Sequence, residues 1–342
     1  MKPLLVLAFA LACASDGVVD DLAGTGQPGF SGDGGPAVQA VVNQPFDLVY
    51  NAAGDLFFAD TGNHRVRRVD ATTGVVTTIA GNGEKGFSGD GGPATAARMD
   101  EPYGLAIDPD GNLYFADRLN RRIRRVDAKT AAIATIAGDG SNASSGDSGP
   151  GVKAGIVEPN DVALDGRGQL AIADVSGHRV RVLDLSTGII STLAGDGRGR
   201  HSGDGGPAKS ASLSGPRAIR FTPDGALLIL ERNGNTLRSV STDGMITTIA
   251  GNGKKGYQGD GGPAKDASFD GPKELDLDAQ GNILIVDTEN NAIRRVDSRT
   301  GVVSTVAKGL DRPHGVAFAP DGTSFVIGDT LNHRLRRVRP KP

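Results

Sequence analysis

The sequence predicts an all-β fold: a six-bladed β-propeller of four-stranded antiparallel blades, with the last blade closed by the N-terminal strand. Three observations predict it: a unit that recurs along the chain, alternating apolar runs within each unit, and a high glycine content. Glycine supplies 51 of 342 residues, about twice its average share, which is typical of many tight turns.

The recurring unit opens at a proline. Pro45, Pro102, Pro159, Pro216, Pro272 and Pro313 each begin a similar stretch, and the first four intervals are 57, 57, 57 and 56 residues. The clearest copy, residues 102–138, reads "PYGLAIDPDGNLYFADRLNRRIRRVDAKTAAIATIAG". Its apolar alternation, broken by turns such as "DPDG" and "DAKT", indicates a four-stranded meander. Such a sheet has two apolar faces, so we expect the copies to stack radially.

The sixth unit ends at "LRRVRPKP" and lacks a fourth strand. The stretch "VVDDLAG" from Val18 aligns with "VVTTIAG" from Val75, 57 positions later. We therefore expect residues 18–340 to form a single propeller in which the first strand completes the last blade. Closing the ring also removes an exposed sheet edge.

The pattern "PxGxAxDxxGNLYxADxxNxRIRxVD", seen best at residues 102–127, recurs in degraded form in all six units. With it the chain resembles the NHL-repeat family over nearly its whole mature length. The resemblance implies a β-propeller fold. It implies little about function, because that family includes sensors, protein-binding and RNA-binding modules and a few enzymes.

The N-terminal stretch "MKPLLVLAFALACAS" predicts an export signal over residues 1–14, too short to span a bilayer. Its only cysteine, Cys13, stands in "ALAC", which resembles the lipobox of bacterial lipoproteins. Two outcomes stay open: a lipid anchor at Cys13, or soluble export after cleavage near Ala14. Both predict a periplasmic or extracellular protein without a disulfide, which touches a membrane only through such an anchor.

Composition argues against a nucleic-acid partner. The net charge is -3, with 37 basic and 40 acidic residues, and aromatic residues make up 4%. Third-strand arginines such as Arg65, Arg67 and Arg68 recur around the ring and predict a solvated, ion-paired rim rather than a one-sided basic patch. The acid that ends each second strand is predicted to cap the following turn; it recurs as Asp60, Asp117, Asp174, Glu231, Asp287 and Asp329.

Comparison of the six copies separates scaffold positions from candidate site positions. Two residues after each blade-opening proline the chain has, in order, Asp47, Gly104, Asp161, Ala218, Glu274 and Gly315. Carboxylates in alternate blades are expected to converge at the mouth of the channel and to repel one another. A divalent cation, most simply Ca²⁺, would relieve that repulsion, with Asn160 as a further oxygen ligand. Two alternatives stay open: an ion-pair cluster with Arg220, or acids that point between blades and bind backbone amides.

Five inserts follow the fourth strands, with the sequence "GDGGPA" or a worn copy of it. Their Asp is predicted to form a turn rather than bind calcium. Four inserts carry an aromatic or His side chain at one position, which we predict to form a collar that binds substrate: Phe30, Phe87, His201 and Tyr257. The connector "KGLDRP" has no insert and leads into His314, so we expect a notch there, unless the insert was lost without consequence. His64, His178 and His333 match a recurring turn and are expected to be structural.

Two functions follow from these residues. In the first, the chain is a metal-dependent hydrolase: Ca²⁺ polarises a carbonyl or phosphoryl oxygen, and His314 is the general base. Its architecture resembles calcium-bearing six-bladed hydrolases such as gluconolactonases and paraoxonases, and its substrates would be esters, lactones or phosphotriesters. The alternative is a non-catalytic envelope module that binds a protein, peptide or glycan. We expect a monomer in either case.

Overall fold

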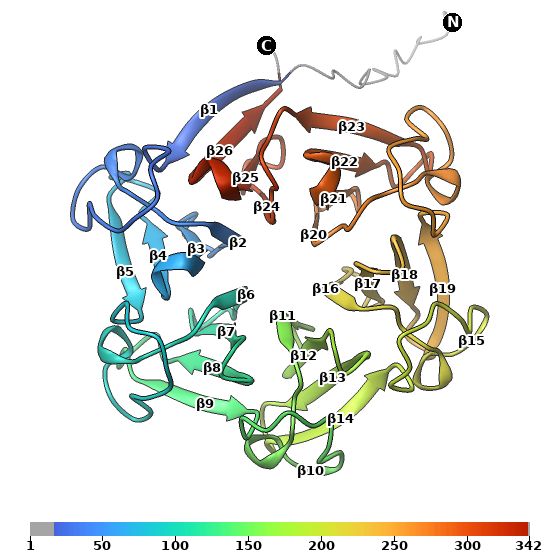
Figure 1. The fold of residues 1–342 in the computed structure, drawn as a ribbon, viewed down its shortest axis with the longest axis horizontal. Coiled ribbons are helices and arrows are strands. Elements are labelled where there is room, and N and C mark those ends of the chain that lie inside the picture. The colour runs from blue at the N-terminus through green and yellow to red at the C-terminus, as the bar shows by residue number, and fades with distance from the viewer. Residues whose placement is uncertain (1–16, 341–342) are drawn as a thin grey trace, which may run out of the picture.

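The structure, a computed structural model, describes residues 17–340. Six antiparallel sheets stand in a ring around a central axis (Figure 1), which confirms the predicted all-β, six-bladed β-propeller. In each blade the first strand lies nearest the axis and the fourth lies at the rim. The export signal and Cys13 lie outside the described residues.

The strands of the six blades, from the axis to the rim, are as follows. Blade 1 contains β2 (Pro45–Tyr50), β3 (Leu56–Asp60), β4 (Arg65–Val69) and β5 (Val76–Ala80). Blade 2 contains β6 (Pro102–Ile107), β7 (Leu113–Asp117), β8 (Arg122–Val126) and β9 (Ile133–Ala137). Blade 3 contains β11 (Pro159–Leu164), β12 (Gln169–Asp174), β13 (Arg179–Asp184) and β14 (Ile189–Ala194). Blade 4 contains β16 (Pro216–Phe221), β17 (Leu227–Glu231), β18 (Thr236–Val240) and β19 (Met245–Ala250). Blade 5 contains β20 (Glu274–Leu277), β21 (Ile283–Asp287), β22 (Ala292–Val296) and β23 (Val303–Lys308). Blade 6 contains β24 (Gly315–Phe318), β25 (Phe325–Asp329), β26 (Arg334–Arg339) and β1 (Val18–Ala23).

Short elements complete the fold. Each of the five inserts carries a single turn of 3₁₀ helix: η1 (Ala37–Gln39), η3 (Ala94–Ala96), η4 (Gly151–Lys153), η5 (Ala208–Ser210) and η6 (Ala264–Asp266). Three second strands are followed by another: η2 (Thr61–Asn63), η7 (Thr288–Asn290) and η8 (Thr330–Asn332). Two inserts add a short strand at the rim of the next blade, β10 (Gly149–Pro150) to β14 and β15 (Gly206–Pro207) to β19.

The ring closes through its two ends. β1 pairs antiparallel with β26, with Val19 opposite Val338 and Asp21 opposite Arg336. Figure 1 shows β1 beside the C-terminal strand, so blade 6 is built from both ends of the described chain. This is the pairing that the alignment of "VVDDLAG" with "VVTTIAG" predicts.

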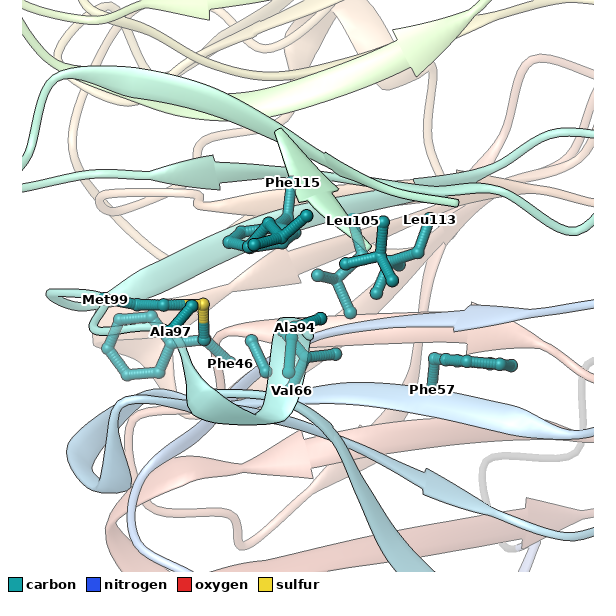
Figure 2. Close-up of a cluster of buried hydrophobic side chains, with 13 residues drawn as sticks. Phe46, Phe57, Val66, Ala94, Ala97, Met99, Leu105, Leu113 and Phe115 are labelled. Atoms are coloured by element: carbon teal, nitrogen blue, oxygen red, sulfur yellow. The ribbon is translucent and has the colours of Figure 1, made fainter. Parts of the chain in front are cut away.

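Apolar side chains fill the seams between neighbouring blades. Figure 2 shows the seam between blades 1 and 2, where Phe46 and Phe57 of blade 1 meet Leu105, Leu113 and Phe115 of blade 2. All of these side chains are at most 9% exposed, and burying each contributes about 1.5–3 kcal/mol. Because the chain has no disulfide within its described part, these seams hold the blades together.

The middle arginine of each third strand corrects the prediction of a solvated rim. Arg67 and its counterparts in blades 2 to 5 are at most 1% exposed: Arg124, Arg181, Arg238 and Arg294. The Arg67 guanidinium lies 2.7 Å from Asp33 of the insert and 3.3 Å from Asp60, and it also donates to the Ser31 carbonyl. The insert folds over the blade and covers this arginine, which is why the alternation of the strand alone did not reveal its burial.

The insert Asp therefore does more than form a turn. Asp33 pairs with Arg67 through one oxygen and accepts a 2.6 Å hydrogen bond from the Thr78 hydroxyl through the other. It thus ties the insert to the third and fourth strands of the blade that follows. Blade 6 has no insert, and there Asp21 stands opposite Arg336 at the position that Thr78 holds in blade 1. Arg336, at 26% side-chain exposure, lies 4.0 Å from Asp21 and 2.8 Å from Asp329.

The acid that ends the second strand holds both the incoming loop and the turn that follows the strand. Asp60 accepts from the Asn43 backbone amide at 2.7 Å and from the Asn63 side chain at 2.9 Å. Only in blade 3, among the described residues, does this acid accept from the backbone of the following turn, where Gly177 donates to Asp174 at 3.2 Å. The predicted contact with the following turn is therefore made in blade 1 through the Asn63 side chain, and the bond to the Asn43 amide adds a contact with the incoming loop.

Candidate functional site at the channel mouth

The alternating acids meet at the axis, as their spacing predicts. Asp47, Asp161 and Glu274 each offer a carboxylate oxygen within 4.8 Å of the others, and all three residues are at most 4% exposed. They come from β2, β11 and β20, the innermost strands of blades 1, 3 and 5. In β2 and β11 the strand register shifts directly after the opening proline, and such a bulge re-aims the side chains that follow it. We call these three residues the axial acid cluster.

Arg220 lies among the three acids. Its guanidinium nitrogens are 2.9 Å from Asp161, 3.3 Å from Glu274 and 3.6 Å from Asp47. A fourth carboxylate, Asp276, lies 3.8 Å away. The ion-pair cluster that the sequence left open as an alternative is therefore present, and one guanidinium faces four carboxylates.

Backbone amides from the seams take most of the remaining oxygens. Asp47 accepts from Leu105 of the next blade at 2.6 Å, and Asp161 accepts from Ile219 at 2.8 Å. Each acid also accepts from the amide of the residue that follows it: Leu48, Val162 and Leu275. The second alternative, acids that bind amides between blades, thus holds for two of the three acids.

Burial and mutual repulsion raise the pKa values of the cluster. Burial, together with the Asp47 carboxylate, raises the pKa of Asp161 to about 6, although Arg220 opposes this. Burial and the carboxylates of Asp161 and Asp47 raise the pKa of Glu274 well above its usual value. Burial also raises the pKa of Asp276 to about 6. Glu274 therefore holds a proton more readily than an exposed glutamate does.

The cluster does not fit a calcium ion beside Arg220. Ca²⁺ takes about six to eight oxygen ligands, whereas Asp47 and Asp161 already use both oxygens on amides. Asn160, the predicted fourth ligand, bonds through its side-chain oxygen to Arg217. A cation could enter only if the Arg220 side chain left.

The residue directly after each blade-opening proline belongs to a second set, which we call the mouth ring: Phe46, Tyr103, Asn160, Arg217, Lys273 and His314. Phe46 stacks on His314 at 4.1 Å between centroids and meets Tyr103 at 4.6 Å. Arg217 reaches from blade 4 to within 4.9 Å of the Tyr103 ring in blade 2. Blades 6, 1 and 2 thus give an aromatic side, and blades 4 and 5 a basic side.

His314 stands in this ring as a neutral imidazole. Burial and the nearby charges of Lys273 and Arg217 lower the pKa of His314 well below its usual value. Its Nδ1 lies 2.8 Å from the Arg312 carbonyl oxygen, which fixes Nδ1 as the protonated nitrogen and leaves Nε2 as an acceptor.

The structure does not bring the predicted collar residues together. The Phe30 ring covers Arg65 at 3.9 Å, and the Phe87 ring covers Arg122 at 3.8 Å. Tyr257 lies 4.9 Å from the Arg294 guanidinium, and its hydroxyl bonds to Thr305. His201 places Nδ1 2.5 Å from the buried Glu231 carboxylate. Each side chain packs on the third strand of its own blade, and the three aromatic rings remain 41–45% exposed.

Two of the remaining histidines, His64 and His333, link blades. His64 accepts through Nδ1 from the Glu101 amide, and His333 accepts from the Gln44 amide, both at 3.2 Å. His64, His178 and His333 all have positive φ values between 50° and 53°, a region in which small polar and His side chains are enriched.

Sequence reasoning missed most of the mouth ring. Candidate positions were compared two residues after each blade-opening proline, and four members of the mouth ring stand one residue earlier: Phe46, Tyr103, Arg217 and Lys273. Reading the column that follows each proline would have shown six different side chains at one structural position, which is the signal of an asymmetric site.

Comparison with known sequences finds modules within larger proteins. No family model matches the chain. SUPPRESSOR OF QUENCHING 1, chloroplastic, from Arabidopsis thaliana is 27% identical over 304 residues, which cover 84% of this chain and 28% of that protein. Teneurin-3 from Danio rerio is 30% identical over 335 residues, 85% of this chain and 12% of that protein. NHL repeat-containing protein 2 from Homo sapiens is 26% identical over 326 residues, 82% of this chain and 44% of that protein. The chain thus spans less than half the length of these relatives.

Solved structures share the fold at low identity. An auxiliary nutrient binding protein from Bacteroides ovatus superposes with a TM-score of 0.69 at 12% identity, covering 95% of this chain and 76% of its own. A protein provisionally assigned as a gluconolactonase gives 0.60 at 15% identity, covering 94% and 92%. A virginiamycin B lyase from Staphylococcus aureus gives 0.55 at 17% identity, covering 87% and 80%. Within residues 17–340, no helix has the length and apolar character needed to cross a membrane.

Proposed function

The chain is a six-bladed β-propeller of the NHL type, and we propose that it is a non-catalytic binding module for a protein partner. Its contact surface is the face that carries the five inserts and the mouth ring, which we call the insert face. The observation that carries the proposal is the position of Arg220 inside the axial acid cluster. The guanidinium supplies there the positive charge that a catalytic cation would supply.

The insert face supports this proposal by its exposed apolar side chains. Five large apolar side chains on this face are 39–45% exposed. Three come from the inserts, Phe30, Phe87 and Tyr257, and two come from the turns that follow the second strands, Leu119 and Leu331. Asn120 of the second turn donates to the Gly86 carbonyl of an insert at 2.7 Å, so both kinds of loop belong to one face. Aromatic residues are enriched at the centres of protein interfaces.

The inserts also present these side chains rigidly. Each insert Asp is held by a buried arginine of the blade beneath it, so little conformational entropy is lost when a partner binds. The matched relatives, in which the propeller is 12–44% of the protein, fit a module that serves different longer chains.

A metal-dependent hydrolase is the second candidate. Two observations favour it: the acids of the axial cluster lie within 4.8 Å of one another, and His314 is a neutral imidazole whose Nε2 is an acceptor. If Ca²⁺ displaced Arg220, Asp47, Asp161, Glu274 and Asn160 would be its ligands and the ion would polarise a substrate oxygen. His314 would take a proton from water at Nε2, and substrates would be lactones, aryl esters or phosphotriesters.

One experiment separates the candidates. We expect purified wild-type protein to hold no stoichiometric divalent cation and to hydrolyse none of these substrate classes, with calcium or with EDTA. A photo-crosslinker at Leu119 on the insert face should capture a partner protein, whereas one at Thr130, in the turn between β8 and β9 on the opposite face, should not. Bound calcium together with EDTA-sensitive hydrolysis would decide for the hydrolase.

Arg220 gives a further test of the same choice. In Arg220→Ala the carboxylates lose their cation, so we expect added Ca²⁺ to raise the melting temperature of the variant but not that of wild type. Arg198→Ala, at a side chain that is 75% exposed, is the matched control and should behave as wild type. A calcium response of equal size in wild type would show that Arg220 does not exclude the ion.

We also propose that the protein is exported, with Cys13 as the anchor if it is lipidated. The support is the N-terminal sequence and the fold shared with an auxiliary nutrient binding protein. Labelling with a radioactive fatty acid, lost in Cys13→Ser, would demonstrate the anchor, and unlabelled protein in the medium would indicate soluble export.

A further inference from the structure

A cleft of about 330 Å³ opens in the seam between blades 3 and 4. Its apolar wall consists of Leu193, Phe221, Leu227 and Val240. Its polar rim consists of Asp165, Arg167, Gln169, Lys209, Ser241 and Thr242. The volume lies in the range of small-molecule sites, about 300–1,000 Å³.

The matching seam between blades 1 and 2 contains an aromatic side chain, Phe57, at a position of the second strand where blade 3 has Ala171. There the counterparts of the apolar wall, 114 positions earlier in the chain, are Ile79, Ile107, Leu113 and Val126. All four belong to the cluster that contains Phe57, which is 7% exposed. Figure 2 shows Phe57 in this seam with Leu105 and Leu113.

The position of Phe57 holds an aromatic ring in two blades and none in blade 3. Blade 2 has Tyr114 there, 4% exposed and packed with Leu164 in the seam to blade 3. Blade 3 has Ala171, which packs with Phe221 and Leu193 in the seam to blade 4. Because Ala171 packs with two residues of the cleft wall, an aromatic ring at position 171 would extend toward the cleft.

The polar rim of the cleft carries charged side chains that could pair with a charged group of a ligand. Arg167 and Lys209 are both exposed, and within residues 17–340 neither forms an ion pair with a carboxylate. The one acid of the rim, Asp165, accepts from the backbone amides of Arg167 and Gln169. The lining residues thus carry two cations and one amide-bound carboxylate, and Asp224 and Asp243 stand next to lining residues in the flanking turns. Arg167 and Lys209 are the two groups of the rim that can pair with an anion.

We propose that this cleft binds a small aromatic carboxylate, whose ring takes the place of the missing aromatic side chain beside Ala171 and whose carboxylate faces Arg167 and Lys209. The site lies in a seam between blades, away from the axial acid cluster, and binding there needs neither a metal nor the mouth ring. The ring of the ligand would contact the apolar wall of the cleft, as the rings of Phe57 and Tyr114 contact apolar side chains in the other two seams.

Ligand-observed NMR with phenylacetate, phenylacetamide and phenethylamine tests the proposal. Wild type should bind phenylacetate most tightly and phenethylamine least. Ala171→Phe fills the cleft from within, so we expect it to weaken phenylacetate binding at least tenfold and to keep or raise the melting temperature. The double variant Arg167→Gln/Lys209→Met should bind the acid and the amide equally.

Phe57→Ala is the matched control, because it should open an equivalent space in the first seam and add a second site for the neutral amide. If Ala171→Phe does not fold, hydrogen exchange on wild type replaces it: phenylacetate should protect amides of β12 and β17 and leave those of β3 and β7 unchanged. Wild-type affinity in folded Ala171→Phe, protection elsewhere, or no binding of any ring-bearing probe by wild type would each overturn the proposal.

Discussion

At the scale of single residues, neighbours of the same type have opposite environments in this fold. Arg124 is buried and lies 2.8 Å from Asp90 and 3.0 Å from Asp117. Arg125, one residue later, points to the other face of the blade and pairs with Asp127 while its side chain stays 34% exposed. Strand alternation sends one guanidinium under the insert and the other toward solvent.

These two arginines make a matched pair for a stability test. In Arg124→Met the fully buried Asp117 loses its cation, so we expect a loss of about 3–5 kcal/mol in the free energy of unfolding. Arg125→Met removes an exposed ion pair and should cost at most about 1 kcal/mol. Chemical denaturation of both variants checks the difference, and equal losses would show that the insert does not shield Arg124.

The axial residues show how far a single sequence can reach. The recurrence of the unit made it possible to predict that Asp47, Asp161 and Glu274 would meet, and they do. It left open whether a bound cation or Arg220 would meet them, because that depends on the bulge and on the reach of Arg220, four residues after its own proline. The sequence also could not show that the Phe30 and Phe87 rings of the predicted collar stack on arginines of the blades beneath them.

At the scale of elements, five blades have an insert whose Asp pairs with the third-strand arginine, and blade 6 has no insert. In blade 5, Asp260 pairs with the buried Arg294 at 2.8 Å, and Thr305 stands opposite that arginine in β23. In blade 6, where no insert exists, the residue opposite Arg336 is Asp21. Asp21 lies 4.0 Å from Arg336 and accepts a hydrogen bond from Arg334, so a carboxylate of the fourth strand stands near the arginine that has no insert Asp.

This exchange predicts a rescue. Asp260→Ala should lower the free energy of unfolding by about 1.5–3 kcal/mol, because a buried guanidinium loses a charged hydrogen-bond partner. Adding Thr305→Asp should restore part of that loss, since it puts a carboxylate where blade 6 has one. The same Thr305→Asp change in the wild-type background, beside an intact Asp260, should instead destabilise by repulsion. Thermal melts of the three variants give the coupling energy, and strict additivity would contradict the exchange.

At the scale of the whole molecule, the axis is the one place where all blades meet, and the chain fills it with charge. Four carboxylates from three blades share one partly buried guanidinium, that of Arg220 in a fourth blade: Asp47, Asp161, Glu274 and Asp276. Burial raises the pKa values of these acids, so their protonated forms are favoured in the folded state. Ring closure by β1 and β26 keeps the blades from moving apart to relieve the repulsion, so the conflict should appear as a dependence of stability on pH.

The pH dependence of stability that the cluster causes can be measured at Asp161. Its pKa is about 6 in the folded protein, against 3.8 for an aspartate in an unfolded chain, so the folded state holds its proton more tightly. The stability that this proton contributes is complete below the unfolded pKa and is lost as pH rises through the folded one. Asp161→Asn cannot titrate, so the stability of wild type relative to this variant should fall by about 1 kcal/mol between pH 5 and pH 8.

The difference between the two proteins is the quantity to measure, because burial lowers the pKa values of His64, His314 and His333, and these groups act in the opposite sense in both proteins. Urea denaturation at each pH gives the difference directly. Asp70→Asn is the control: that carboxylate is fully exposed and hydrogen bonds with Thr73 lower its pKa, so its effect should not change between pH 5 and pH 8. A wild-type advantage that grows with pH would mean that Arg220 keeps Asp161 ionised throughout, and the axis would then be an ordinary ion-pair cluster rather than a proton-sharing one.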